Sequence, residues 1–309
     1  MRMPHVLLIA AALLVTSCSP REMIMRKVMT DNADYFDAPD MRGSELVKHT
    51  AHVWSFRWTW YRSVVIETSE GLVVTDPFND TAATALAAAL AKQFPGKPIH
   101  TLLYSHYHLD HARGGSKLPA PKQILAHEKC PGYWKAAGAT DVLAPTQLLE
   151  GKDQTLAIGG IEIQLLFTGH AHSDTNFAVF VPAERVLWVA DMNLVKAYPP
   201  FGGPDHYAPG YMTALDRLAT LEFDHYLPSH FGTGNKKDFL EGKEHYEFHR
   251  RIAREAIAKI GPPRDKKSLG AHFDYIYPRA KERYGDWRGF DDHALQLLIR
   301  QESGELLGY

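Results

Sequence analysis

Short apolar runs alternate with amphipathic stretches along most of the chain. The runs at 64–66 and 72–74 flank a Ser-Glu-Gly turn, a pattern that predicts a β-hairpin. Behind Asp80, apolar residues recur every four positions as far as Phe94, which predicts a helix that Asp80 caps. Further strands are expected at 99–104, 124–126, 161–167, 177–181 and 186–189, and further helices at 213–221 and 237–260. This mixture of hairpins and strand–helix units predicts an α/β protein with sheets inside and helices outside.

The first residues follow a different pattern, that of an export signal. Arg2 precedes an unbroken apolar run at 6–15, which is too short to cross a bilayer comfortably but fits a signal peptide. The run leads into Val-Thr-Ser-Cys, which resembles a bacterial lipobox and predicts a lipid anchor at Cys18. The alternative is an ordinary secretory signal that is cleaved near Ser17. Either form predicts an exported protein, periplasmic or anchored to a membrane.

These patterns divide the chain into four parts. We expect a lipoprotein-type signal peptide at 1–18 and a polar tether with the entry to the domain at 19–45. The main domain is expected at 46–260. Residues 261–309 are expected to form a C-terminal extension that packs on this domain, with a short helix near Leu295.

Composition narrows the classes of function. The chain has 309 residues, of which 45% are hydrophobic and 23% charged, as in a globular protein. Its net charge of -2, without a basic cluster, argues against nucleic acid as a partner. Without Cys18, only Cys130 remains, so we expect no internal disulfide and interpret Cys130 as an inert buried thiol. The 17 histidines are unusual, and their positions indicate a metal site.

The segment from Ser105 to His111 carries four metal-ligand side chains within six residues, directly after the expected strand at 99–104. In an extended stretch, His106, His108 and Asp110 would point to one side, whereas His111 would point elsewhere. This arrangement suits two neighbouring ions better than one. Imidazole and carboxylate together favour Zn²⁺ or a similar first-row ion.

The motif His-x-His-x-Asp-His resembles that of the metallo-β-lactamase superfamily, and further segments over about residues 45–235 extend the resemblance in the family's order. They are the acidic Asp76, the Gly-His-Ala-His-Ser-Asp-Thr-Asn stretch that includes His172, the strand end at Asp191 and the Pro-Ser-His-Phe-Gly segment that includes His230. The resemblance implies an αββα four-layer sandwich over residues 46–260. It also implies that Asp76 braces the metal loop.

The same resemblance assigns the ligands of two divalent metal ions, with Zn²⁺ expected and iron or manganese left open. His106, His108 and His172 would form one site, Asp110, His111 and His230 the second, and Asp191 would bridge them. His170 is an alternative to His172. His245 and His249 lie four residues apart on a helix, but the glutamate of a zincin motif is missing, and we interpret them as solvated.

Two such ions can lower the pKa of a shared water and so provide hydroxide at neutral pH. The sequence therefore predicts a metal-dependent hydrolase of small-molecule esters, lactones, thioesters or related amides, in which Asp110 also orients the hydroxide. The best-known zinc β-lactamases carry cysteine or serine at the bridging position, so Asp191 argues against a dedicated β-lactamase. The alternatives are a β-lactamase, an accessory metal-binding lipoprotein without turnover, and an iron dioxygenase, which a complete second site disfavours.

The expected pocket wall is aromatic. Trp58 and Trp60 precede the first hairpin, and Tyr198 and Tyr207 follow Asp191 in a loop rich in proline and glycine, together with Phe201 and Tyr211. These residues would favour a hydrophobic or ring-bearing substrate. Lys196, in the same loop, is a candidate to hold a substrate carboxylate.

Overall fold

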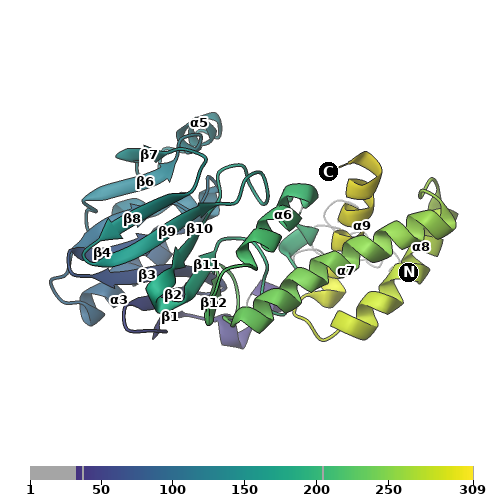
Figure 1. The fold of residues 1–309 in the computed structure, drawn as a ribbon, viewed down its shortest axis with the longest axis horizontal. Helices are drawn as coiled ribbons and strands as arrows, with labels where there is room; N and C mark the ends of the chain where they lie inside the picture. Colours follow the sequence, from purple (N-terminus) through teal and green to yellow (C-terminus); the bar gives the residue numbers. More distant parts are fainter. Residues whose placement is uncertain (1–32, 37, 204, 309) are drawn as a thin grey trace, which may run out of the picture.

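The computed structural model of the protein describes residues 33–36, 38–203 and 205–308. Two β-sheets lie face to face, and helices cover their outer faces (Figure 1). The expected signal peptide and Cys18 lie outside the described residues. In the described part of the chain, no helix has the length and apolar character needed to cross a membrane.

The strands of the first sheet pair antiparallel in one half of the sheet and parallel in the other. Its strand order is β1-β2-β3-β4-β5-β6-β7, with antiparallel pairs as far as β4 and parallel pairs from β4 to β7. The strands are β1 (Ser44–Lys48), β2 (Val53–Trp58), β3 (Tyr61–Thr68), β4 (Gly71–Thr75), β5 (Ile99–Leu103), β6 (Gln123–His127) and β7 (Gln147–Leu149). The predicted hairpin at 64–74 is therefore confirmed as β3 and β4.

The second sheet has the order β12-β11-β10-β9-β8, and only β11 and β12 run parallel to each other. Its strands are β8 (Gln154–Ile158), β9 (Ile161–Phe167), β10 (Phe177–Val181), β11 (Val186–Val189) and β12 (His225–Pro228). Every residue of β10 and β11 is buried, because one face meets the first sheet and the other meets helices. This explains why these strands are continuous apolar runs in the sequence.

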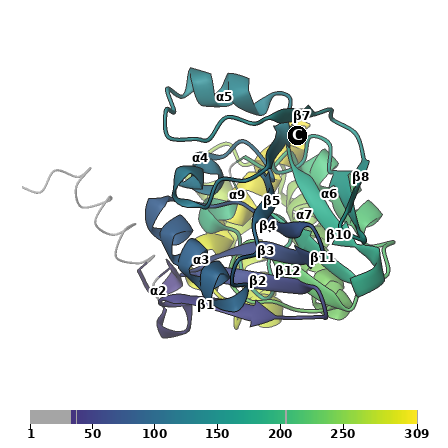
Figure 2. The same cartoon turned by 90° about the vertical axis from the view of Figure 1, so that its left-hand side faces the viewer.

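Apolar side chains fill each layer boundary. Between the sheets, Val64 and Leu103 of the first sheet pack with Val179 and Trp188 of the second. On the outer face of the first sheet lies α3 (Asp80–Gln93), which Figure 2 shows beside the strands. On the outer face of the second sheet lie α6 (Ala208–Leu218) and α7 (Lys236–Ile260). This succession confirms the predicted αββα sandwich.

Two helix starts differ from the sequence-based expectation. Asn79 caps α3 through its side chain, which accepts a hydrogen bond from the Ala82 amide, and Asp80 is the first helical residue. Helix α6 begins at Ala208, earlier than the expected 213, because Pro209 lies in the first turn, where the missing amide proton costs nothing. The shorter helices are α2 (Ala33–Phe36), α4 (Leu109–Ala112), α5 (Cys130–Ala136), η1 (Pro39–Met41), η2 (Gly115–Lys117), η3 (Pro182–Glu184) and η4 (Pro200–Gly202).

The C-terminal part is more helical than the sequence indicated. Instead of one short helix near Leu295, it forms α8 (Lys266–Tyr284) and α9 (Phe290–Leu307), which pack with α7 (Figure 1). Pro278 lies inside α8, and such a residue normally argues for a helix end. In the expected tether, Tyr35 is buried against Phe231 and His293, so this part of the segment belongs to the packed fold.

Candidate metal centre

The candidate ligands follow strand ends that the sheets bring to one edge. His106 and its neighbours follow β5, Asp191 follows β11, and His230 follows β12. The parallel register pairs Thr75 with Leu103 in the first sheet and Val189 with Pro228 in the second. Since parallel strands end at the same edge, residues far apart in the sequence meet there. The amide of Phe177 donates to the Ser105 carbonyl at 2.9 Å and so joins the two sheets at this edge.

Asp76 is the polar centre of the first loop, as the sequence suggested. Its Oδ1 accepts a hydrogen bond from the Ser105 amide at 2.8 Å, and its Oδ2 accepts one from the Ser105 hydroxyl at 2.6 Å. The same Oδ2 lies 2.9 Å from Nδ1 of His111, and Ser105 Oγ lies 2.8 Å from Nδ1 of His106. These contacts hold the Nδ1 side of both rings, so that each Nε2 points into the centre.

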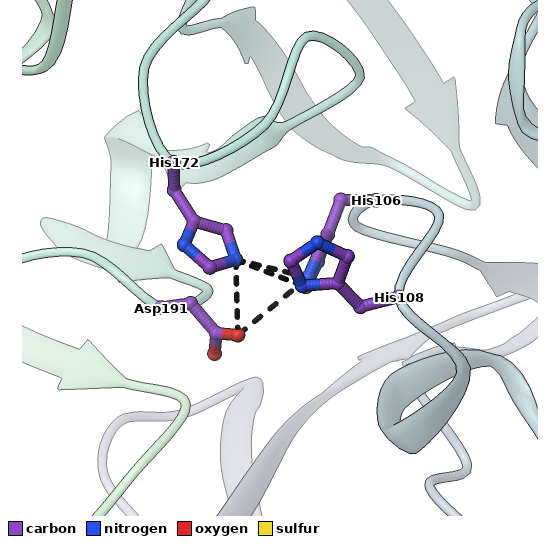
Figure 3. A group of neighbouring side chains, drawn as sticks. All are labelled: His106, His108, His172 and Asp191. Carbon is purple, nitrogen blue, oxygen red and sulfur yellow. Dashed lines mark hydrogen bonds and ion pairs between the residues drawn. The ribbon is translucent and has the colours of Figure 1, made fainter. Parts of the chain in front are cut away.

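Three histidines and one carboxylate oxygen form a first cluster (Figure 3). His172 Nε2 lies 3.3 Å from His106 Nε2 and 3.1 Å from His108 Nδ1. Asp191 Oδ2 lies 3.2 Å from His172 Nε2 and 3.5 Å from His106 Nε2. His108 therefore presents Nδ1 to the cluster, whereas the other two present Nε2.

These spacings fit a bound metal ion. Four ligands placed tetrahedrally at about 2.0–2.1 Å from an ion would lie about 3.3–3.4 Å from one another. The observed separations of 3.1–3.5 Å scatter around that value. Three imidazole nitrogens and a carboxylate oxygen are also a ligand set that suits Zn²⁺ and similar ions. The residues of this cluster thus fit the metal that the sequence predicted.

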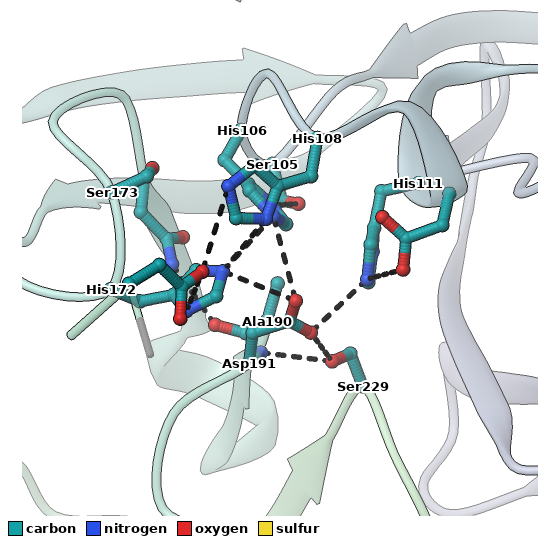
Figure 4. A network of polar contacts seen from close by, with 12 residues as sticks. Ser105, His106, His108, His111, His172, Ser173, Ala190, Asp191 and Ser229 are labelled. Atoms are coloured by element: carbon teal, nitrogen blue, oxygen red, sulfur yellow. Dashed lines mark hydrogen bonds and ion pairs between the residues drawn. The ribbon is translucent and has the colours of Figure 1, made fainter. Parts of the chain in front are cut away.

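A second cluster shares Asp191 with the first. Asp191 Oδ1 lies 3.1 Å from His111 Nε2 and 2.7 Å from His230 Nε2. Figure 4 shows this carboxylate between His172 on one side and His111 on the other. One oxygen thus faces each histidine group, which is the geometry that a bridging carboxylate requires.

The backbone and Ser229 fix the orientation of Asp191. Ser229 Oγ donates to Asp191 Oδ1 at 2.6 Å and accepts from the Asp191 amide at 2.9 Å. Asp191 has a φ of 55°, a left-handed conformation that is uncommon for a residue other than glycine and is often found at functional sites. Burial opposes charge on Asp191, but His111, His230 and His172 outweigh it and hold the pKa of its carboxyl well below the usual range. The group is therefore a carboxylate, the form that binds metals.

His230 is fixed from the side of the first sheet. Its ring stacks on Trp60 with centroids 4.2 Å apart and an interplanar angle of 22°. The buried Arg62 donates to the Phe231 carbonyl at 2.8 Å, and its backbone amide donates to the Ser229 carbonyl at 2.5 Å. These contacts tie the segment after β12 to β3.

Asp110 stands apart from both tight clusters. Its Oδ2 lies 3.8 Å from His111 Nε2 and accepts a hydrogen bond from the Tyr61 hydroxyl at 3.1 Å. Burial, and then the Asp110 charge, raise the pKa of Tyr61, so this hydroxyl keeps its proton and acts as the donor. Asp110 is half-exposed, which leaves its carboxylate accessible from the solvent side of the centre.

The structure adds an acidic residue that the sequence did not indicate. Asp205 Oδ2 lies 3.3 Å from Nδ1 of His172 and 3.6 Å from Nε2 of His108, the outer nitrogens of two cluster residues. A carboxylate in this place orients an imidazole and raises its basicity as a ligand. Next to it, burial lowers the pKa of His206 to about 3. The loop after Asp191 is irregular, and no periodicity in it indicated which residue would turn back toward the centre.

The loop that carries His172 is anchored by the start of α6. The Tyr207 amide donates to the Ala171 carbonyl at 2.8 Å, and a Cβ at Gly210 would lie 1.8 Å from the His170 carbonyl oxygen. Only glycine allows the helix to approach this closely. The exposed His170 ring stacks on Tyr207 with centroids 4.6 Å apart, outside both clusters, whereas His172 lies in the first.

A cavity of about 300 Å³ opens onto both clusters. Trp60 lines it, as expected, together with Phe201 of the Pro/Gly-rich loop. The other expected wall residues lie elsewhere: Trp58 packs with the α3 layer, Tyr198 is fully buried, Tyr207 covers His170 and Lys196 points to solvent. Tyr198 is held inward because its hydroxyl pairs with His249 at 3.2 Å and its carbonyl accepts a hydrogen bond from Tyr35.

The expectation that His245 and His249 are solvated is wrong. Both are buried between α7 and the C-terminal helices, where His245 stacks on Trp287 at 4.6 Å and His249 Nδ1 lies 2.7 Å from the His245 carbonyl oxygen. They are packing residues and not ligands, as the missing glutamate indicated. Cys130 is also buried, and burial raises the pKa of its thiol to about 12.

Comparison with known proteins agrees with this architecture. The profile of the metallo-beta-lactamase superfamily matches residues 62–230, a span that includes all the candidate ligands. The chain belongs to this superfamily. Its members are mostly metal-dependent hydrolases, and the His/Asp groups of this chain are able to bind metal ions.

Two curated relatives come from Nocardioides sp. (strain JS1661). The alpha subunit of a 2,4-dinitroanisole O-demethylase is 32% identical over 60% of this chain and 57% of its own length. The beta subunit of the same enzyme is 22% identical over 62% of this chain and 60% of its own length. The chain thus spans less than two thirds of the length of these relatives.

Solved structures share the fold at low sequence identity. A stereoselective inverting sec-alkylsulfatase from Pseudomonas sp. is 17% identical, with a TM-score of 0.69 over 86% of this chain and 50% of the sulfatase. A metallo-beta-lactamase from Pontibacter korlensis is 19% identical, with a TM-score of 0.56 over 65% of this chain and 98% of its own. The first likeness extends beyond residues 62–230, so the shared fold includes segments outside the profile match.

Proposed function

We propose that the protein is a hydrolase that uses two divalent metal ions, with Zn²⁺ as the expected metal. His106, His108 and His172 would hold one ion, His111, His230 and Asp110 the other, and Asp191 would bridge them. The observation that carries the proposal is the Asp191 carboxylate, of which one oxygen faces each histidine group. A single ion would need only one of these groups.

The residues of the chain divide the work. When bound, the two ions would supply Lewis acidity and lower the pKa of water toward 7, so that hydroxide is present at neutral pH. Asp191 offsets part of their charge, and Asp76 and Asp205 set the orientation of the ligand rings. Asp110, held by Tyr61 and open to solvent, accepts a hydrogen bond from the attacking water and directs it to the substrate.

The proposed reaction is hydrolysis of an ester, lactone, thioester or related amide. The oxygen of water bonds to the carbonyl carbon, and the bond from that carbon to the leaving oxygen, sulfur or nitrogen breaks. The leaving atom takes the electron pair and the proton that water has lost. The O-demethylase relative is named for an aryl methyl ether, which adds activated aryl ethers to the substrates worth testing.

The decisive experiment combines metal analysis with a substrate panel. We expect close to two metal ions per chain, turnover of at least one lactone, aryl ester or thioester, and loss of turnover on chelation that added metal restores. Nitrocefin would be hydrolysed poorly or not at all. Turnover that persists after complete chelation, or a fully loaded protein inactive on the whole panel, would refute the proposal.

We further propose that the protein is exported and anchored through a lipid on Cys18. The support is the sequence of the leader, from Arg2 through the apolar run to Cys18. Cys18→Ala should leave the chain unprocessed or release it from membranes, which fractionation and mass spectrometry of the N-terminus would detect. A soluble wild-type protein whose N-terminus lies upstream of Cys18 would contradict the anchor.

A further inference from the structure

Apart from the candidate ligands and the buried imidazole of His206, the walls of the cavity at the metal centre are apolar or acidic. Apart from the ligands, Trp60, Leu194, Phe201 and two prolines provide its apolar surface. Asp110 and Asp205, both partly exposed, provide its charged surface. Among the described residues that line it, none is lysine or arginine.

A second groove, which His108 and Asp110 also line, has the same character. It measures about 510 Å³ and is lined mainly by aromatic and aliphatic side chains, again with no lysine or arginine among its described lining residues. Lys129 is already paired with Asp174 at 2.8 Å, and the Tyr133 hydroxyl of the groove shares that carboxylate. The guanidinium of Arg300 donates to the His206 carbonyl, and Arg300 is not among the residues that line the cavity.

Two bound divalent ions would not give the cavity a net positive charge, because carboxylates of the chain neutralise the charge of the ions. Four carboxylates, those of Asp76, Asp110, Asp191 and Asp205, lie within 4 Å of the candidate ligand rings. They match the four positive charges of two divalent ions. An anionic substrate would therefore find no spare positive charge in the centre and would have to leave water for an apolar wall, which is costly for a charged group.

Resting on the proposed function, we infer that the substrate of this centre is an uncharged molecule with a flat apolar group, such as an aryl ester, and that the site discriminates against anionic substrates such as sulfate esters and β-lactam carboxylates. A volume of about 300 Å³ is at the small end for ligand pockets, which suits a substrate of roughly one ring. The ring would lie against Trp60 and Phe201. Phe201 is 49% exposed and so still has apolar surface to bury.

The reaction balances without a further reactant. Water adds its oxygen to the acyl carbon of the aryl ester, and the bond from that carbon to the aryl oxygen breaks. The phenolate leaves with the electron pair and takes up the proton released by water. The products are a carboxylic acid and a phenol, and the apolar wall would contact only the ring.

Two substrates that differ in charge and by a single methyl group separate the effect of charge from that of the ring. Methyl 4-acetoxybenzoate is neutral, whereas 4-acetoxybenzoate carries a carboxylate at the same ring position. Relative to their rates with free hydroxide, we expect the metal-loaded wild-type enzyme to have at least a tenfold higher kcat/KM for the neutral ester. High salt should narrow the ratio, because screening weakens repulsion by Asp110 and Asp205.

A positive charge added to the cavity should let the site accept the anionic ester. Phe201→Lys places a cation at the exposed edge of the cavity and should raise the relative kcat/KM for the carboxylate ester several-fold. Phe201→Gln, which removes the ring but adds no charge, is the matched control and should leave the preference for the neutral ester. Metal analysis of both variants excludes an indirect effect on the ligands.

Calorimetry of product binding gives a readout that needs no turnover. Methyl 4-hydroxybenzoate should bind the metal-loaded protein more tightly than 4-hydroxybenzoate, and Phe201→Lys should reduce the difference. If the anionic ester is turned over and its product bound as well as the neutral pair, the inference is wrong while the hydrolase proposal stands. If neither ester is turned over but the neutral product binds more tightly, the discrimination against anionic ligands stands, whereas the proposed hydrolysis of aryl esters fails.

Discussion

Histidines gather in two regions of this molecule, and they do different things in each. At the strand ends, ring nitrogens of His106 and His108 lie 3.3 and 3.1 Å from Nε2 of His172, and the three rings share a cluster with the Asp191 carboxylate. In the helical layer, His245 and His249 are as deeply buried but meet aromatic faces and backbone carbonyls. In the described part of the chain, no carboxylate pairs with these two rings.

The difference shows what makes a buried histidine a ligand. Burial and close spacing are common to both regions, so neither distinguishes them. What distinguishes them is convergence of several ring nitrogens on one point, with carboxylates behind the rings that fix their orientation. The following changes test that distinction, from the largest expected effect to the smallest.

Replacement of Asp191 should have the largest effect. Asp191→Asn keeps the shape of the side chain but removes its negative charge. It also replaces one of the two oxygens, each of which faces a histidine group, with an amide nitrogen. We expect weaker binding at the second site and a fall in kcat by orders of magnitude. Metal analysis and steady-state kinetics would measure both. Full activity with two tightly bound ions would show that Asp191 does not bridge.

The two histidines of the 169–173 loop should differ sharply. His172→Ala removes a ring that lies 3.1–3.3 Å from two others and should abolish metal binding at the first site. His170→Ala removes only a stack on Tyr207 and is the matched control, with near wild-type metal content. The reverse result would mean that the ligand assignment in this loop is wrong.

Asp205→Asn should have an intermediate effect. It leaves every candidate ligand in place but removes the carboxylate behind His172 and His108. Loss of such a partner typically weakens metal binding about 10–100-fold, and we expect a change in that range. Competition with a chromophoric chelator would measure it, and Asp205→Glu, which restores the charge, should recover part of the affinity. Unchanged metal affinity in Asp205→Asn would show that Asp205 does not support the ligand rings. Its role would then be limited to the repulsion of anionic substrates.

The smallest effect should come from the helical layer and should appear only as pH dependence of stability. Burial lowers the pKa of His249 from 6.5 to about 4, so the unfolded chain binds a proton in this window that the folded chain does not. The contribution of neutral His249 to the free energy of unfolding should therefore be greatest above pH 6.5 and fall as the pH drops toward 4. His249→Gln should reduce that loss by at most about 3 kcal/mol. Urea unfolding with chelator present would show it, and metal content should not change.

The sequence indicated which candidate ligands gather at the centre better than it indicated the walls of the pocket. His106 to His111 are close in sequence and follow a recognisable strand, so their pattern alone specifies the chemistry. Asp205 and Tyr61 reach the centre through tertiary packing, which leaves no periodic signal. Tyr198 was expected at the pocket because it is aromatic and follows Asp191, but hydrogen bonds to His249 and Tyr35 turn it into the core. The loop conformation, including φ of 53° at Phe201, decides which aromatic ring faces the cavity.

The parts of the fold that could be predicted are also those with a local pattern in the sequence. Strands such as 177–181 are wholly apolar and were found with their observed bounds, because burial on both faces leaves a continuous pattern. Helices α8 and α9 were missed or shortened, since Pro278 interrupts one and the other carries acidic residues and a glycine among its apolar positions. Their stability comes from packing on α7, which local sequence does not reveal.

The position of Asp76 between the two clusters has a consequence for the order in which the centre would take up metal ions. One carboxylate contacts His111 directly and His106 through Ser105, so a single residue orients ligands of both clusters. Occupation of either cluster would fix the ring that Asp76 holds there and, through Asp76, help to order the ring of the other cluster. Metal uptake by the apoprotein should then be positively cooperative, with the empty and doubly loaded forms dominating a native mass spectrum at half saturation. Asp76→Asn would uncouple the two steps, and singly loaded protein would accumulate.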